Sequence, residues 1–198
     1  EVSFTEEGAR LSYSSPHLEE GYPGNVEIQV EYKILKDEPG YKTEIRAQTD
    51  QTTLVNINTH EYFDLSGGKT KDVFQDHNLL LNSRLFVEMG EECLPTGHLK
   101  DTSDHPAFEF SSRRKIRENR NNPESQWDSL VGFDTSYVLG KFTGDNSLVP
   151  ASFSLDKLDP KTKLDIPFAG TLSSTSSGLA MDMYTNQEAI HFYGGVYL

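Results

Sequence analysis

Alternation of apolar and polar residues is the main pattern along this chain. Across residues 26–35, apolar side chains occupy every second position and charged or amide side chains lie between them. Because successive side chains of a strand point to opposite faces, this period of two predicts a half-buried strand. A Pro-Gly pair at residues 39–40 separates it from a second alternating run at residues 41–49. The two runs predict an antiparallel hairpin.

Shorter apolar runs follow along the rest of the chain, separated by clusters of Gly, Pro, Asn and Asp. We expect strands at residues 53–58, 78–86, 137–142, 151–155, 179–184 and 189–193. Only residues 113–121 predict a helical turn, because no long segment repeats apolar residues at three-to-four spacing. The pattern therefore predicts an all-β, antiparallel fold. A chain of 198 residues is long enough for one such domain, and we expect residues 1–198 to form a single domain.

Charge and cysteine content narrow the range of partners. The chain has 18 Lys and Arg against 31 Asp and Glu, a net charge of −13. This excess repels nucleic-acid phosphates and anionic lipid, so we expect no nucleic-acid and no membrane partner. No run approaches the roughly 20 apolar residues of a membrane-spanning helix. The single cysteine, Cys93, provides no internal disulfide framework, and we expect a cytoplasmic protein.

Three groups of short motifs carry a family resemblance. The first is S-S-P-H-L-E-E-G-Y-P-G at residues 14–24, and the second is V-N-I-N-T-H-E-Y-F-D-L-S-G at residues 55–67. The third comprises L-P-T-G at residues 94–97, G-F-D at residues 132–134 and A-I-H-F-Y-G at residues 189–194. In order and spacing these segments resemble motifs of the galactose mutarotase (aldose 1-epimerase) family, over nearly the whole chain.

The resemblance implies an antiparallel β-sandwich of the galactose mutarotase-like (supersandwich) type, incomplete in this chain. It also implies that the protein interconverts the α and β anomers of a free hexose such as galactose or glucose. In this reaction a proton leaves the C1 hydroxyl while another reaches the ring oxygen, so that the ring opens and closes again on the other face. The chemistry needs an acid and a base, and we expect no cofactor. The His, Asp and Glu residues show no metal-ligand spacing, and we expect no metal site.

The same resemblance assigns roles to individual residues. His60 becomes the general acid, because an imidazole holds and releases a proton near neutral pH; a core histidine bonded to a backbone carbonyl is the plain alternative. We expect Tyr62 to share a strand face with His60 and border the sugar, and Phe63 to face the core. Asp134 is expected to accept hydrogen bonds from sugar hydroxyls. His191, where the family has Gln, is predicted to bind the substrate by donating to a hydroxyl.

Two further expectations come from the family motifs. His77, in Q-D-H at residues 75–77, resembles the family's I-x-D-H and predicts a structural role. The family's general base is a Glu in a loop beyond residues 197–198, and its other sugar-contacting Arg and His lie before Glu1. We therefore expect the remaining part of the domain as a separate or missing segment that covers the sheet edges, and we expect this chain alone to be inactive.

Two other functions remain open at this point. A hexose 6-phosphate 1-epimerase needs a cationic clamp, and one basic cluster is available: Arg113, Arg114, Lys115, Arg117 and Arg120. A solvated face is the plainer interpretation of such a charge run. A catalytically inactive carbohydrate-binding module of the same fold is favoured by three departures from the family motifs: Thr59, Thr135 and His191.

Overall fold

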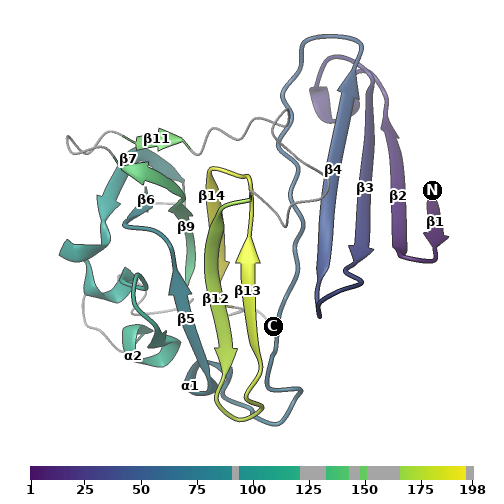
Figure 1. Cartoon of the computed structure of the whole chain (residues 1–198). Helices are drawn as coiled ribbons and strands as arrows, with labels where there is room; N and C mark the ends of the chain where they lie inside the picture. The colour runs from purple at the N-terminus through teal and green to yellow at the C-terminus, as the bar shows by residue number, and fades with distance from the viewer. Residues whose placement is uncertain (91–93, 121–132, 143–147, 151–165, 195–198) are drawn as a thin grey trace. The chain divides into compact units, whose positions relative to one another are not determined.

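A computed structural model describes residues 1–90, 94–120, 133–142, 148–150 and 166–194 (Figure 1). The chain divides into two compact units, residues 1–61 and residues 62–198. The expectation that residues 1–198 form one domain stays a prediction. Cys93 and the strand expected at residues 151–155 lie outside the described residues. Within the described part, no helix is long and apolar enough to cross a membrane.

The first unit is one antiparallel sheet with the strand order β1-β2-β3-β4. Its strands are β1 (Val2–Thr5), β2 (Gly8–Ser15), β3 (Val26–Ile34) and β4 (Tyr41–Thr49), with a short 3-10 turn, η1 (Glu19–Gly21), between β2 and β3. Val30 lies opposite Ile45, so the apolar positions of β3 and β4 share one face. On the other face Lys33 Nζ lies 3.1 Å from Glu31 Oε2 and 3.2 Å from Glu44 Oε2. The predicted hairpin is confirmed.

The described residues of the second unit form two four-stranded sheets and one two-stranded sheet, and all the strand pairs among them are antiparallel. The first sheet has the order β13-β12-β5-β8, the second the order β14-β9-β6-β7, and the small one pairs β10 with β11. The elements are α1 (Val73–Asp76), β5 (His77–Leu81), β6 (Leu85–Met89), β7 (Pro95–Asp101), η3 (Thr102–Asp104), η4 (Pro106–Phe108), β8 (Arg114–Lys115), α2 (Ile116–Arg120), β9 (Asp134–Val138), β10 (Gly140–Phe142), β11 (Leu148–Pro150), β12 (Phe168–Ser174), β13 (Ala180–Tyr184) and β14 (Ala189–Tyr193). The predicted all-β, antiparallel fold is confirmed.

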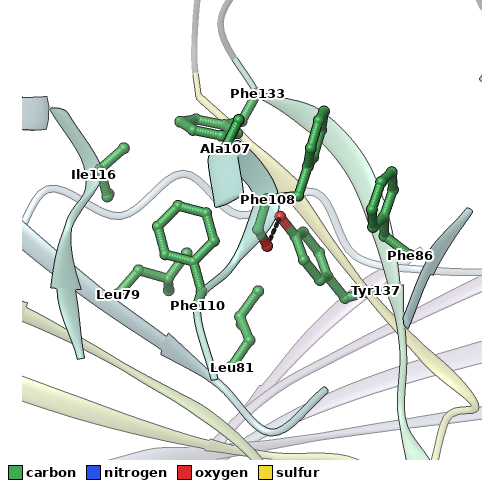
Figure 2. Close-up of a cluster of buried hydrophobic side chains, with 9 residues drawn as sticks. All are labelled: Leu79, Leu81, Phe86, Ala107, Phe108, Phe110, Ile116, Phe133 and Tyr137. Carbon is green, nitrogen blue, oxygen red and sulfur yellow. Dashed lines mark hydrogen bonds between the residues drawn. The ribbon is translucent and has the colours of Figure 1, made fainter. Parts of the chain in front are cut away.

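The core of the second unit draws side chains from both four-stranded sheets (Figure 2). Leu81 comes from β5, whereas Phe86 and Tyr137 come from β6 and β9 of the other sheet. The Phe86 ring stacks on Phe108 with centroids 4.4 Å apart. Tyr137 is fully buried and its hydroxyl donates to the Phe108 carbonyl at 3.1 Å. Burial of this apolar cluster holds the two sheets together and leaves the opposite face of β9 available for polar residues.

The structure corrects three expected strands. Residues 52–64 contain no strand or helix, so the strand expected at residues 53–58 is wrong. Leu54 and Val55 are 80% and 50% exposed, and their apolar side chains are not on the buried face of a sheet.

The other two corrections are interrupted strands. The run at residues 78–86 divides into β5 and β6 of different sheets, because the chain bends at Asn82 and Arg84. Between these bends, Ser83 Oγ donates to the Val138 carbonyl at 2.7 Å. The run at residues 137–142 divides at Leu139 into β9 and β10. By contrast, β13 and β14 lie at the expected positions, and α2 confirms the helical turn.

Candidate functional site

Pairing of β9 with β14 gathers polar side chains on one face of the sheet. Tyr193 lies opposite Asp134, and His191 lies opposite Ser136. Because side chains alternate along both strands, these four residues share one face. The intervening Thr135 is 1% exposed and belongs to the opposite, buried face. Two strands distant in sequence therefore bring together Asp134 and His191, two of the residues predicted to bind substrate.

A single imidazole connects the polar residues of this face. His191 Nε2 lies 2.7 Å from Asp134 Oδ1, and Ser136 Oγ lies 2.8 Å from His191 Nδ1. The side chains of His191 and Asp134 are 48% and 43% exposed, so neither is packed in the core. We call Asp134, Ser136 and His191 the polar cluster. Both ring nitrogens are engaged within it, so the imidazole has a fixed orientation.

Tyr62 reaches the same face through an aromatic contact. Its ring centroid is 6.0 Å from that of Tyr193 and the ring planes meet at 75°, an edge-to-face arrangement. Tyr193 is the cross-strand partner of Asp134, so Tyr62 lies beside the end of the strand pair that carries the polar cluster. Tyr62 is 53% exposed. The structure thus brings together three of the four predicted site residues.

The fourth, His60, belongs to residues 1–61, the other unit, where its side chain is exposed. Its assignment as the general acid stays a prediction. The expectation that His60 and Tyr62 share a strand face is wrong, because residues 52–64 form no strand. Phe63, expected to face the core, is 43% exposed for the same reason: without the pleat of a strand, alternation does not decide which side chains point inward.

The turn that follows Tyr62 is held by two side chains. Asp64 accepts hydrogen bonds from the backbone N–H of Ser66 at 2.8 Å and of Gly68 at 3.1 Å. His77 Nε2 accepts from the Leu65 N–H at 3.0 Å, while its Nδ1 lies 3.0 Å from the Val73 carbonyl. A carbonyl only accepts, so Nδ1 carries the hydrogen.

His77 is only 3% exposed, and its contacts match the structural role predicted for it. The next residue toward the N-terminus, Asp76, anchors the turn between β12 and β13. Its carboxylate accepts from Ser174 Oγ at 2.5 Å and from the Ser176 N–H at 2.8 Å. The hydrogen bond from Ser174 is the main reason why the pKa of the Asp76 carboxyl is lowered. The contacts of Asp76 thus hold α1 against the turn between β12 and β13, and His77 ties the turn after Tyr62 to the start of β5.

Sequence reasoning missed two members of this face, Ser136 and Tyr193. Tyr193 could have been predicted from the sequence, because it lies two residues beyond His191 on a correctly predicted strand. Ser136 could not have been predicted in this way, because the predicted strand begins at residue 137, whereas β9 begins at Asp134. Across the described residues, no three His, Cys, Asp or Glu side chains are grouped as a metal ion would require.

Comparison with known proteins identifies the family. The family model for aldose 1-epimerase matches residues 1–197. The galactose mutarotase of Sus scrofa is 27% identical over 191 residues, covering 96% of this chain and 47% of that protein. The aldose 1-epimerase of Haemophilus influenzae is 24% identical over 188 residues, covering 95% of this chain and 48% of that protein. The chain thus spans about half the length of the curated relatives that it matches.

Solved structures give the same fold. A crystal structure of a GalM/aldose epimerase homologue from C. elegans aligns with a TM-score of 0.75 at 23% identity, covering 100% of this chain and 52% of the other. Galactose 1-epimerase from Lactobacillus acidophilus NCFM aligns with a TM-score of 0.60 at 27% identity, covering 75% of this chain and 42% of the other. These alignments confirm the galactose mutarotase-like fold expected from the motifs. By its matching family model, its fold and its motifs, the chain belongs to the aldose 1-epimerase family.

Proposed function

We propose that the protein carrying this chain is an aldose 1-epimerase that interconverts the α and β anomers of a free hexose such as galactose or glucose. The observation that carries the proposal is the half-exposed pair of Asp134 and His191, 2.7 Å apart. Tyr62 lies at the same end of the β9–β14 pair. A carboxylate, an imidazole and an exposed aromatic ring form a suitable surface for a polyhydroxylated ring.

The chemistry assigns a separate task to each residue. Asp134 accepts hydrogen bonds from sugar hydroxyls and, with His191 and Tyr62, binds the substrate. His60 gives a proton to the ring oxygen as the C1–O5 bond breaks, and a base takes the C1 hydroxyl proton. After rotation about C1–C2, the C5 hydroxyl returns its proton to His60 on ring closure, and the base protonates the former carbonyl oxygen. No proton is gained or lost over the cycle.

The general base that takes the C1 hydroxyl proton is not among the residues to which we assign a role in this chain. Because the chain spans about half the length of its relatives, we propose that the remaining part of the domain supplies the base, in the same polypeptide or in another. By "intact protein" we mean this chain together with that part. In this view residues 1–198 belong to one domain, the chain alone lacks activity, and the intact protein works in the cytoplasm.

Ion pairs of two residues of the basic cluster support a free hexose, and not its 6-phosphate, as the substrate. Arg114 Nη2 lies 2.8 Å from Glu109 Oε2, and Arg117 Nη2 lies 2.6 Å from Asp72 Oδ2. A guanidinium paired with a carboxylate contributes little net positive charge to a phosphate clamp. We therefore favour the free sugar over the phosphate.

Polarimetry of the intact protein tests this function. Freshly dissolved α-D-galactose and α-D-glucose are followed to anomeric equilibrium with and without protein, and the 6-phosphates are followed by NMR under the same conditions. We expect acceleration for the free sugars and weaker acceleration for the phosphates. Bound galactose with no acceleration would indicate an inactive carbohydrate-binding module, and faster conversion of the phosphates would indicate a hexose 6-phosphate epimerase.

A further inference from the structure

Ser136 lies in the polar cluster but has no assigned role. It shares a face with Asp134 two positions away on β9, and its Oγ lies 2.8 Å from His191 Nδ1. Its side chain is half-buried. It lies outside the family motifs, two residues after the last residue of G-F-D. Ser136 therefore lies beside two proposed substrate-binding residues, Asp134 and His191.

The hydrogen-bond direction within the cluster follows from the partners. An ionised carboxylate only accepts, so the contact of Asp134 with His191 requires a hydrogen on Nε2. A neutral imidazole carries one N–H, so Nδ1 is an acceptor. With the ring neutral, Ser136 therefore donates its single hydroxyl hydrogen to Nδ1. Toward any ligand, the Ser136 oxygen has only lone pairs left.

We propose that Ser136 is a substrate-binding residue that acts as a hydrogen-bond acceptor; this rests on the function proposed above. Ser136 and the second oxygen of Asp134 then present two acceptors, one of them charged, to the ligand. Two acceptors match two hydroxyl groups of a neutral sugar and repel a phosphate or a carboxylate. In this arrangement the one N–H of His191 goes to Asp134, so His191 contributes to binding by orienting both acceptors and does not itself donate to a sugar hydroxyl, the role expected from the motif. The ligand class is a neutral hexose that donates two hydroxyl hydrogens to this face.

Nitrogen NMR of the imidazole tests the hydrogen-bond direction without any substrate. Spectra of the ¹⁵N-labelled intact protein are recorded in the pH range in which the nitrogen resonances themselves show a neutral His191 ring. We expect a hydrogen on Nε2 and an unprotonated Nδ1 that accepts a hydrogen bond, and we expect Ser136→Ala to shift the Nδ1 resonance. A hydrogen on Nδ1 in the neutral ring would make Ser136 an acceptor for His191 and would overturn the proposal.

Deoxyfluoro sugars test the acceptor role, since fluorine in place of a hydroxyl removes the donated hydrogen. Binding of D-galactose and of its monodeoxyfluoro analogues is measured for the wild type, Ser136→Ala and Ser173→Ala. Ser173 is a matched control, a half-buried serine inside β12 that is no part of the polar cluster. We expect Ser136→Ala to weaken galactose binding by about 3- to 10-fold, the range for one neutral hydrogen bond. One fluorine position should penalise the wild type by a similar factor and Ser136→Ala by less than about 2-fold.

The outcomes separate this inference from the function on which it rests. If the wild type binds and converts galactose but Ser136→Ala behaves like Ser173→Ala, the role of Ser136 is refuted and the proposed function stands. The same holds if every fluorine penalty is unchanged in Ser136→Ala. If the wild type binds no hexose, both proposals fail. A Ser136→Ala variant that does not fold leaves the NMR measurement on the wild type as the deciding test.

Discussion

Replacing Tyr137 with Phe probes how the fold presents the polar cluster. Tyr137 belongs to β9, and its side chain points away from the face that carries Asp134 and Ser136. It is fully buried, and its hydroxyl donates to the Phe108 carbonyl at 3.1 Å. Burial raises the pKa of the Tyr137 phenol, so the hydroxyl keeps its hydrogen throughout the ordinary pH range. The change to Phe removes one buried donor and leaves the ring.

The expected loss of stability follows from the hydrogen bond between the Tyr137 hydroxyl and the Phe108 carbonyl. A neutral hydrogen bond contributes about 0.5–1.5 kcal/mol, and a buried acceptor that loses its donor costs about 1–3 kcal/mol. No ring volume is lost, so no large cavity term is added. We expect Tyr137→Phe to lower the free energy of unfolding by about 1–2 kcal/mol. For a chain of this size this corresponds to a fall in Tm of roughly 2–8 °C.

Urea unfolding of the wild type and the variant, followed by circular dichroism, measures this difference. Tyr184→Phe is the matched control, because Tyr184 lies on β13 with its side chain 52% exposed and should change stability by less than about 0.5 kcal/mol. Galactose affinity of the folded Tyr137→Phe protein should equal that of the wild type, since the site lies on the other face of β9. A stability loss no greater than that of Tyr184→Phe would refute the packing argument, and a loss of affinity would refute the separation of the two faces.

Two further predictions concern residues around the site. Removing the Tyr193 ring with Tyr193→Leu should weaken galactose binding by about 2- to 10-fold through the loss of its edge contact with Tyr62, while Tyr193→Phe retains affinity; isothermal titration calorimetry measures both. The lowered pKa of Asp76 contributes stability that is present above the pKa of an unfolded carboxyl and is lost as the pH falls through the folded value. The stability advantage of the wild type over Asp76→Asn should therefore shrink as urea unfolding is repeated from pH 6 down to pH 3, and an advantage that is constant with pH would contradict this.

Strands with a clear alternation were predictable, and strands defined by close packing were not. The hairpin of β3 and β4 follows from nine-residue alternating runs and a Pro-Gly turn. Strand β12 has no such pattern, although it lies centrally between β13 and β5 (Figure 1). At Gly170 an added Cβ would lie 2.4 Å from the Leu80 carbonyl oxygen, so small residues in β12 permit the close approach of β5. A segment whose packing requires small side chains shows no hydrophobic period.

The site could be predicted only in part, for a related reason. Asp134 and His191 were identified by their motifs, but their contact depends on the register between β9 and β14, which are more than 50 residues apart in sequence. A shift of that register by one residue would place His191 on the buried face. The same register brings Ser136 and Tyr193 into the site, and no local pattern specifies it.

The most direct test of the central claim is the turnover of a His60→Asn variant of the intact protein. Loss of a general acid lowers the rate by about two to four orders of magnitude. His98→Asn, which changes an exposed histidine of β7, serves as the control and should keep wild-type turnover. Polarimetry with α-D-galactose should show this loss for His60→Asn, with galactose binding retained. Turnover of His60→Asn close to that of the wild type would contradict the account.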